Sequence, residues 1–457
     1  MNQQASPSLS LSNPHPKGVN WQQKAALALF GIGLLILLFA WLGGQVWNPF
    51  QALLLALGLI SGSAWWYARA EYGGKPAGIK NNAVMFRSLS NRGLWGWIAG
   101  VMISGFYICL YWYPETMKGL IEMFEAPSRA LRGQAADQWF VYGSFYTLAV
   151  LLMGAKFIWK YRHNRYQVIR TVSVMFFQLI FSFLIPAFMQ LMHQPEFYFT
   201  YFWPLKSEYL FPDKISYLTQ KYTHLGVFLV FWGAVMSFIA VPVLTYFFGK
   251  RWYCSWVCGC GALAETAGDP FRTLSDKSLR AWRIERWLIH SVLVFIVLTT
   301  LLAWLNSWQQ GAILGDLSQG FSKTYGFLIG SIFSGVIGTG FYPILGSRGW
   351  CRFGCPQAAI LGIFQKYFSR FRITVNGGQC ISCGNCSTYC EMGIDVKAYA
   401  QRGQDVVRAS CVGCGICSAV CPRGVLRLEN GADDVRERAQ DARAFHIGED
   451  GVKLNDH

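Results

Sequence analysis

The chain has 457 residues, of which 53% are hydrophobic and only 14% are charged. Because a soluble domain carries about 25% charged residues, this composition excludes an ordinary soluble enzyme. It also excludes a disordered chain or a coiled coil, which need far more charge. The 40 lysine and arginine residues exceed the 24 acidic residues, for a formal net charge of +16. This excess indicates either a nucleic-acid-binding protein or a membrane protein with positive loops on one side.

Apolar runs of about 20 residues, the length needed to cross the hydrocarbon core of a bilayer, recur along the chain. We expect eight membrane spans, at residues 25–41, 50–67, 93–113, 139–159, 168–192, 223–248, 287–305 and 325–345. The first two runs are short and could instead form a re-entrant hairpin. The sequence therefore predicts a mainly α polytopic membrane helix bundle.

The loops between these runs divide the positive charge unevenly. With the N-terminus placed inside, the inner segments carry 19 lysine and arginine residues and the outer loops carry seven. This distribution obeys the positive-inside rule for a protein with both termini in the cytoplasm. We therefore expect a multi-pass protein of the bacterial cytoplasmic (inner) membrane and no nucleic-acid partner.

A cysteine motif occurs twice, after the sixth and after the eighth predicted span. Residues 251–262 read Arg-Trp-Tyr-Cys-Ser-Trp-Val-Cys-Gly-Cys-Gly-Ala, and residues 348–359 read Arg-Gly-Trp-Cys-Arg-Phe-Gly-Cys-Pro-Gln-Ala-Ala. Cysteines four positions apart share one face of a helical turn. The repeat would therefore bring four thiols together at the cytoplasmic membrane edge: Cys254, Cys258, Cys351 and Cys355.

Four converging thiolates suit iron, zinc, copper(I) or an iron–sulfur unit. The arginine beside each pair would stabilise the thiolates. The alternatives are simple packing of buried cysteines and a redox-active thiol pair. Cys260 has no counterpart in the second copy, where Gln357 takes its place, and Cys109 lies inside the third span. Neither of these two cysteines is assigned a role.

The strongest signal is a pair of cysteine quartets near the C-terminal end. Their spacing is that of bacterial two-cluster ferredoxins, in which the fourth cysteine of each quartet ligates the other cluster. The spacing assigns one 4Fe–4S cluster to Cys380, Cys383, Cys386 and Cys421, and the second to Cys390, Cys411, Cys414 and Cys417. Disulfides are not expected in a reducing cytoplasm, and zinc sites lack the three-residue step within each quartet. Glu391 follows Cys390 where bacterial ferredoxins usually have proline, which we expect to alter the turn and the potential of that cluster.

These patterns divide the chain into five parts. A cytoplasmic polar tail (1–24) precedes about four N-terminal membrane helices (25–159) and a four-span membrane core with both Cys-x3-Cys motifs (160–373). A small α+β two-cluster ferredoxin module (374–430) follows, with short strands expected at 406–408 and 425–428, and then a charged tail (431–457).

From about residue 161 to residue 430 the chain resembles the membrane polyferredoxins of the NapH, NosR and CcoG type. The resemblance rests on Arg165-Tyr166-Gln167 at the entry to a span, on the two Cys-x3-Cys motifs and on the C-terminal double cluster, in that order. The first motif departs from the family pattern, because Gly259 stands where the family has proline. The resemblance implies a NapH-like four-span core and electron transfer at the cytoplasmic membrane, with quinol as donor.

The leading hypothesis is a membrane electron-transfer protein, a quinol dehydrogenase or an electron-transfer subunit within a larger complex. It would pass electrons between a quinol pool, or another redox protein, and two cytoplasmic 4Fe–4S clusters. The alternative is a maturation factor for a metalloenzyme, such as a CcoG-like copper reductase, or a NosR-like accessory redox protein. No quinone site is assigned. His193 and His224 lie near the outer ends of the fifth and sixth spans, where lone histidines are more often satisfied polar anchors. His290 lies within the seventh span and is the better candidate for a function, because ionisable groups inside a membrane are costly, but it has no evident partner.

Overall fold

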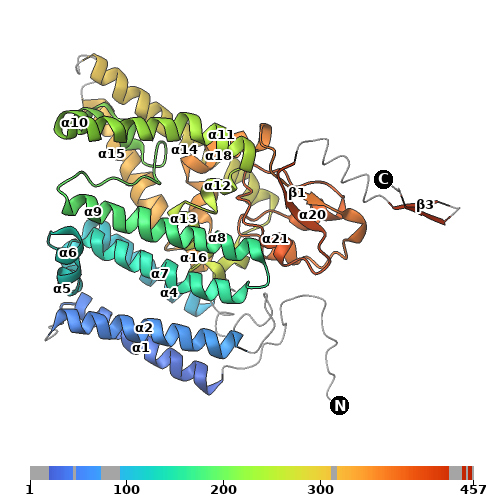
Figure 1. Ribbon diagram of the computed structural model, residues 1–457, viewed down its shortest axis with the longest axis horizontal. Coiled ribbons are helices and arrows are strands. Elements are labelled where there is room, and N and C mark those ends of the chain that lie inside the picture. Colours follow the sequence, from blue (N-terminus) through green and yellow to red (C-terminus); the bar gives the residue numbers. More distant parts are fainter. Residues whose placement is uncertain are drawn as a thin grey trace.

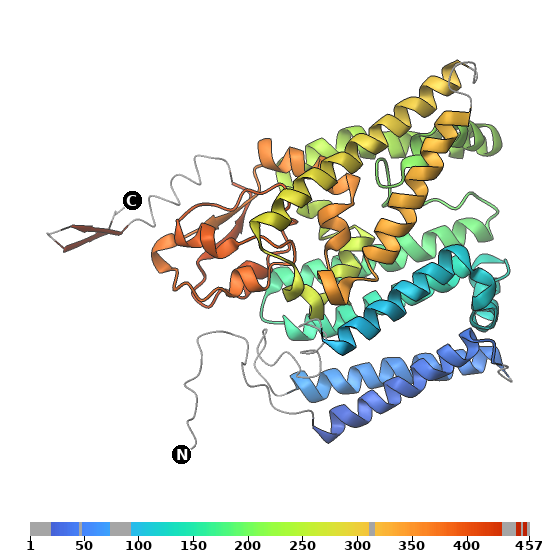
Figure 2. The same ribbon diagram turned by 180° about the vertical axis from the view of Figure 1, so that it is seen from behind.

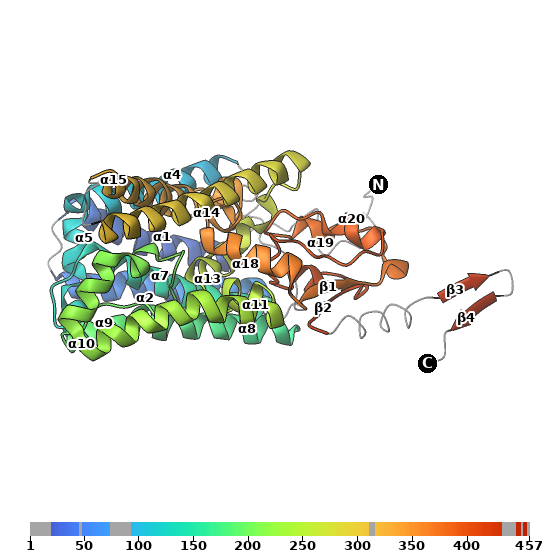
Figure 3. The same cartoon turned by 90° about the horizontal axis from the view of Figure 1, so that it is seen from above.

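The computed structural model describes residues 20–44, 48–73, 93–309, 316–431, 445–448 and 451–454. Most of the two predicted tails, 1–24 and 431–457, and the inner loop at 74–92 lie outside the described residues. Long helices form a bundle, and a small cysteine-rich domain with a two-stranded sheet stands at one end of it (Figure 1). Seen from above, the long helices run roughly along one direction, which leads toward that domain (Figure 3).

The N-terminal helices form a hairpin along one side of the bundle (Figure 2). Helix α1 (Trp21–Trp41) begins with a capping box, in which the Asn20 side chain accepts from the Gln23 N–H. It packs closely against α2 (Pro49–Tyr72). The chain continues through α4 (Leu94–Trp112), η1 (Pro114–Met117), α5 (Lys118–Met123), α6 (Glu125–Arg132) and α7 (Gln138–Lys160).

Three further long helical runs follow. They are α8 (Arg165–Phe176) continued by the π-helix η2 (Phe177–Leu184) and α9 (Ile185–Leu191); α10 (Pro212–Val235) continued by η4 (Met236–Ala240) and α11 (Val241–Phe248); and α14 (Leu279–Trp308). The short η3 (Ser207–Leu210) lies between the first two. A fourth run joins α15 (Asp316–Tyr325) to η6 (Gly326–Ile337).

Among the described residues, six helices are long and apolar enough to cross a membrane, and the count rises to seven if α4 and the helix bent away from it by 114° form one span. The sequence predicts eight spans. The eighth, 325–345, corresponds to η6 (Gly326–Ile337) and α16 (Tyr342–Leu345), and turns at 338–341 interrupt the helix between them. Large apolar side chains such as Phe231, Trp287 and Leu301 remain exposed along the long helices, as expected for surfaces that face lipid.

Short helices connect the long ones at the level of the repeated cysteine motif. The first copy comprises α12 (Arg251–Cys254) and α13 (Gly259–Glu265), followed by η5 (Asp269–Leu274). The second copy comprises α17 (Gly349–Phe353) and α18 (Pro356–Tyr367), preceded by α16 (Tyr342–Leu345). These segments lie in the middle of the bundle, between the long helices and the cysteine-rich domain (Figure 1).

The C-terminal domain is built on two antiparallel strands, β1 (Arg372–Val375) and β2 (Leu426–Glu429), with Arg372 opposite Glu429. Its helical pieces are η7 (Gly377–Gln379), α19 (Asn385–Thr388), α20 (Val396–Gln401) and α21 (Ile416–Ala419). The strand expected at 425–428 is present as β2, whereas at 406–408 only Val406 forms an isolated bridge, to Ile373. A further hairpin, β3 (Phe445–Gly448) with β4 (Gly451–Leu454), follows. The mainly α membrane bundle with a small α+β module is thus confirmed.

Candidate iron–sulfur sites

The eight quartet cysteines line two separate cavities in the C-terminal domain. One is lined by Cys380, Cys383, Cys386 and Cys421. The other is lined by Cys390, Cys411, Cys414 and Cys417. We term them the distal and the proximal cavity. Each takes three cysteines from one quartet and one from the other, which is the grouping that the spacing predicts; ligation by these residues stays a prediction.

The loops around both cavities adopt the same backbone conformation. Helices α19 and α21 each begin after a glycine in the left-handed region, Gly384 with φ 80° and Gly415 with φ 73°. A side chain there would be strained, so glycine lets the loop turn sharply around the sulfurs. At Gly413 (φ 63°), a Cβ atom would also come within 2.6 Å of the Arg251 side chain.

The donor set and its spacing fit an iron–sulfur cube. Among the described residues, no three cysteine sulfurs lie within 4.8 Å of one another. A single tetrahedral ion with metal–sulfur bonds of about 2.3 Å would hold its sulfurs about 3.8 Å apart, so these sites are wide enough for a larger group. Burial raises the pKa of Cys411 to about 11 and that of Cys386 to about 12, so binding of a cluster must displace protons.

The proximal cavity faces the helix bundle. Three side chains from the bundle donate hydrogen bonds of 2.8 Å to carbonyl oxygens of the cysteine loop. These are Tyr166 to Gly413, Gln167 to Cys414, and Ser255 to Val412. The loop that carries three of the four proximal cysteines is therefore held by the membrane helices themselves.

Gln365 of α18 is a second clamp on the same loop. Its Nε2 donates to the carbonyl oxygens of Cys411 (2.7 Å) and Arg408 (2.8 Å). Its Oε1 accepts from the backbone N–H of Lys250 (2.7 Å). One buried amide thus ties the proximal cavity to the segment that leads into the first Cys-x3-Cys motif.

The distal cavity, by contrast, lies at the exposed side of the domain. Cys383 is exposed, and the neighbouring Ile381 leaves 41% of its surface accessible. Lys397 and Arg423 also line this cavity. The proximal cavity therefore lies beside the helix bundle, and the distal cavity lies at the surface of the domain.

The four thiols of the repeated motif come together in the middle of the protein. All four are buried and belong to one core cluster, which also includes Tyr253 and Trp350. Arg348 links the two copies, because its Nη1 donates to the carbonyl oxygen of Cys254 (3.2 Å) and to Sγ of Cys351 (3.6 Å). We term this group the four-thiol site.

The four-thiol site extends deeper into the bundle than the expected membrane edge. Gln178 donates to the Val257 carbonyl (2.7 Å), and the Tyr146 hydroxyl donates to the Gly259 carbonyl (2.8 Å). Gln178 lies thirteen residues beyond Arg165, where α8 begins, which is about 20 Å along a helix axis. Irregular backbone at such depth needs protein partners for its polar groups, and these two side chains provide them.

The two arginines of the motif differ, although both were expected to stabilise thiolates. Only Arg348 reaches a thiol. The Arg251 guanidinium lies over the Phe371 ring (4.6 Å) and near the Tyr166 ring (5.8 Å). Stacking on these rings, which flank the proximal loop, draws Arg251 away from the first cysteine pair.

Gly259 replaces the proline of the family pattern for a steric reason. A Cβ atom at this position would collide with the Tyr201 hydroxyl and would lie 2.9 Å from the Tyr146 hydroxyl and from Gln178 Oε1. The polar side chains that hold the loop therefore leave no room for any residue larger than glycine.

Polar atoms without partners lie beside the four-thiol site. Trp350 Nε1 and both amide atoms of Gln357 are buried, and among the described residues none of them has a hydrogen-bond partner. Buried polar groups normally have partners. These free donors and the wide sulfur spacing fit a bound iron–sulfur unit better than simple packing of cysteines.

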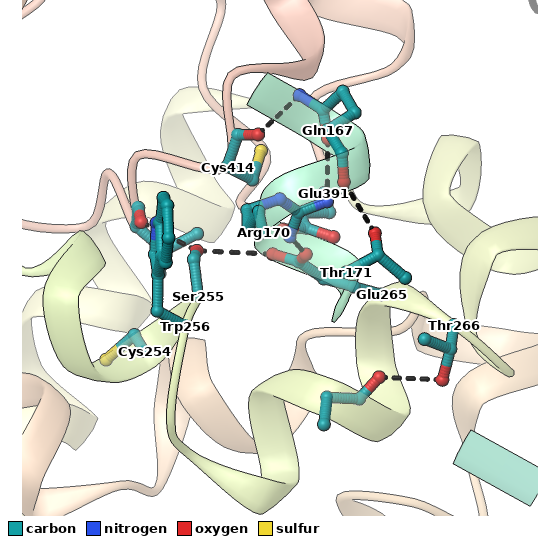
Figure 4. A network of polar contacts seen from close by, with 12 residues as sticks. Gln167, Arg170, Thr171, Cys254, Ser255, Trp256, Glu265, Thr266, Glu391 and Cys414 are labelled. Carbon is teal, nitrogen blue, oxygen red and sulfur yellow. Dashed lines mark hydrogen bonds and ion pairs between the residues drawn. The ribbon is translucent and has the colours of Figure 1, made fainter. Parts of the chain in front are cut away.

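A buried ionic network joins the four-thiol site to the proximal cavity through Arg348. Figure 4 shows the part of it around Arg170, Glu265, Glu391 and Cys414. Glu265 pairs with Arg170 and with Arg348 (2.5 Å), and it accepts from the Ser255 hydroxyl (3.2 Å). Glu391 pairs with Arg272 (2.9 Å) and Arg348 (3.1 Å). The sulfur of Cys414 lies within 4.8 Å of a carboxylate oxygen of each glutamate.

Glu391, which stands where bacterial ferredoxins usually have proline, belongs to this ionic network. Burial alone would raise the pKa of Glu391, but Arg272 and Arg348 outweigh it and hold that pKa below its ordinary value. Glu391 is therefore an anion at neutral pH, beside the proximal cavity. The sequence signalled its position only as a departure from the pattern, and it gave no sign of its partners.

Of the two cysteines without a predicted role, Cys260 lies at the four-thiol site, where its thiol is within hydrogen-bonding reach of Cys258. Cys109 lies apart from these sites, is partly buried and packs against the N-terminal helix cluster. His193, His224 and His290 are exposed.

Two protein families match the chain. A 4Fe-4S binding domain matches residues 230–278 and 326–376, which contain the two copies of the repeated motif. A 4Fe-4S dicluster domain matches residues 379–426, which contain all eight quartet cysteines. The chain is therefore an iron–sulfur protein.

Several known proteins are similar to part of the chain. YccM of Escherichia coli (strain K12) is 27% identical over 186 residues, 36% of this chain and 47% of that protein. The methylamine utilization ferredoxin-type protein MauN of Methylobacillus flagellatus is 27% identical over 160 residues, 34% of this chain and 54% of that protein. The ferredoxin-type protein NapH of Haemophilus influenzae is 26% identical over 172 residues, 36% of this chain and 55% of that protein. The chain thus spans about half the length of these relatives, and no solved structure gives a significant match.

Proposed function

We propose that this chain, a homologue of ferredoxin-type membrane proteins such as NapH and MauN, transfers electrons between a quinol pool or a partner redox subunit and two 4Fe–4S clusters. The observation that carries the proposal is the order of the sites. The four-thiol site lies within the bundle, the proximal cavity at its end, and the distal cavity at the exposed side of the domain.

The proposed ligands are the cysteines of the two cavities, in the crossed grouping given above. Clusters bound there would accept and release single electrons. The residues around them hold the path together: Gln167, Ser255 and Gln365 fix the proximal loop, and Gln178 fixes the deep loop of the four-thiol site.

For the four-thiol site we propose an iron–sulfur unit. Three observations support it: the sulfurs are too far apart for one shared ion, buried donors stand free beside them, and a 4Fe-4S binding domain matches each copy of the motif. The domain limits 160–373 and 374–430 are likewise proposed, with β1 (Arg372–Val375) at the boundary.

We further propose that the protein lies in the bacterial inner membrane with both termini in the cytoplasm, as part of a larger redox complex. The positive charge of the inner loops supports this orientation. The exposed distal cavity would then face a cytoplasmic partner.

The test is to purify the full chain anaerobically and to count iron and acid-labile sulfide, with EPR spectra of the reduced protein. A variant with serine at Cys254, Cys258, Cys351 and Cys355 should keep about eight irons, the content of two 4Fe–4S clusters, while the wild type holds more. Cys109→Ser, a membrane cysteine outside the site, is the control and should match the wild type. Equal iron in all three proteins would exclude an iron centre at the four-thiol site.

A quinol analogue then tests the electron donor. Stoichiometric reduction of the clusters by the analogue supports the quinol route, and no reduction leaves a partner subunit as the donor. A labile metal at the four-thiol site that exchanges for copper would instead favour the maturation-factor alternative. Absence of iron altogether would refute the proposal.

A further inference from the structure

Arg348 lies between the four-thiol site and the proximal cavity and contacts residues of both. One nitrogen of its guanidinium lies 3.6 Å from the Cys351 sulfur and 3.2 Å from the Cys254 carbonyl oxygen. Its Nε lies 3.1 Å from a carboxylate oxygen of Glu391, the residue that follows the proximal ligand Cys390. A single fixed cation therefore spans the gap between the four-thiol site and the proximal cavity.

This contact is sealed from water. The side chains of Arg348, Arg170 and Glu391 are 0% exposed, and that of Glu265 is 3% exposed. Charges act on one another far more strongly in such surroundings than at a protein surface, where water and salt screen them. The guanidinium also keeps its proton at every working pH, so its charge does not change during electron transfer.

The distal cavity has no comparable neighbour in the described part of the chain. Its charged lining residues are Lys397, which is half-buried, and Arg423, which is exposed. Electrons that reach the two clusters would therefore meet different fields, one set by a buried ionic network and the other set largely by solvent.

We propose that Arg348 is a positioning residue: its fixed positive charge raises the reduction potential of the proximal cluster, and its contact with Cys351 at the four-thiol site holds that charge in place, which couples the two sites. This coupling rests on the proposed function, since it needs a cluster in the proximal cavity. When one electron passes between the two, the donor centre is oxidised by one electron and the acceptor is reduced by one, with no proton or other reactant.

Substitutions that remove charges of opposite sign, at Arg348 and at Glu391, distinguish electrostatic coupling from a general loss of structure. Arg348→Gln removes a cation beside the proximal cluster and should lower its potential, because the added electron loses a favourable charge. Glu391→Gln removes an anion from the same place and should raise that potential. Arg348→Lys keeps the charge and should stay near the wild type. A loosened structure would shift the potential in the same direction in every variant.

The measurement is an EPR-monitored redox titration of the purified full chain. Cys383→Ser, which alters an exposed cysteine of the distal cavity, identifies the distal signal. Arg132→Gln is the control for loss of a buried arginine. Arg132 pairs with Asp137 and belongs to α6, which lies at the end of the bundle away from the C-terminal domain (Figure 1). We expect the proximal potential to shift in opposite directions in Arg348→Gln and Glu391→Gln, with the distal potential unchanged and no shift in Arg132→Gln.

Cys351→Ser, alone and combined with Arg348→Gln, completes the test as a double-mutant cycle. The Cys351→Ser shift of the proximal potential should shrink when Arg348 is replaced. Equal shifts in both clusters, shifts of the same sign in Arg348→Gln and Glu391→Gln, or strictly additive effects would overturn the coupling. If Arg348→Gln fails to fold, Arg348→Lys and Glu391→Gln decide the sign. Absence of a third iron centre in the wild type would refute the function proposed for the four thiols, whereas the potentials report separately on Arg348.

Discussion

Replacing Gln365 by leucine should release the proximal cluster. The amide makes three hydrogen bonds, with the Lys250 N–H and with the carbonyl oxygens of Arg408 and Cys411. Leucine has a similar volume but leaves the buried Lys250 N–H and Cys411 carbonyl without a partner, whereas the Arg408 carbonyl still accepts from the Cys411 N–H. Each unsatisfied buried group costs about 1–3 kcal/mol, so the loop that carries Cys411 should be destabilised by at least about 2 kcal/mol. At about 1.4 kcal/mol per factor of ten, this is roughly thirtyfold.

The assay is the rate at which the purified protein loses its cluster absorbance in detergent with an iron chelator. Release should be roughly thirtyfold faster in Gln365→Leu, and the proximal EPR signal should disappear before the distal one. Gln401→Leu is the matched control, because its amide makes one hydrogen bond, to Ser382, on the exposed side of the same domain. Surface substitutions of this kind stay within about 0.5 kcal/mol. Equal rates of cluster release in the two variants would refute the idea that Gln365 stabilises the proximal loop.

Three further predictions test other parts of the structure. Cys421→Ser should alter the same EPR signal as Cys380→Ser, and Cys390→Ser the same signal as Cys417→Ser; grouping by quartet instead would contradict the crossed ligation. Gly259→Ala should reduce the yield of folded protein, because its Cβ meets the Tyr201 hydroxyl, and Tyr201→Phe should restore it; no rescue would mean that the clash lies elsewhere. Asp269→Asn should lower the unfolding temperature at pH 7. Burial raises the Asp269 pKa, but Lys160 (2.7 Å) and Arg272 outweigh it, and the net pKa is lowered. The stabilisation is therefore present above the ordinary carboxyl pKa and lost as the pH falls through the lowered one, so a difference from wild type that persists in acid would argue against the ion pairs.

The cysteine spacing predicted which four cysteines line each cavity, because the geometry of this ferredoxin motif depends on residues that are close together in the sequence. Three cysteines two residues apart wrap around one cavity, and the three-residue step carries the fourth to the other. Hydropathy likewise located the long helices, since about 20 apolar residues suffice to mark a span. At the predicted span 325–345 it did not detect the turns at 338–341, which separate η6 from α16.

The ionic network could not be predicted in the same way. Arg170, Glu265, Arg272, Arg348 and Glu391 come from segments far apart in the sequence, and their contacts arise only when the two copies of the repeat meet the C-terminal domain. Arg170 and Arg272 are among the 19 lysine and arginine residues of the predicted inner segments. Both are buried and form ion pairs. Part of the positive charge that supports the predicted membrane orientation therefore belongs to the ionic network.

The depth of the four-thiol site also escaped the sequence. The segments that carry the motif are short and follow apolar runs, so they looked like the ends of spans. Their course into the bundle depends on Gln178 and Tyr146, which satisfy the backbone of the loop. Single polar residues within an apolar helix do not reveal which distant carbonyl they will meet.

The helix α8 and its continuation η2 contact both redox regions. Gln167 holds the Cys414 carbonyl and Gln178 holds the loop beside Cys258, and eleven residues of helix separate them, or about 16 Å along the axis. The number of helical residues between the two glutamines therefore sets the distance between the four-thiol site and the proximal cavity. One inserted residue between the two glutamines would turn one of them by about 100° relative to the other and break one of the two contacts, whereas an insertion beyond Gln178 would leave both in place.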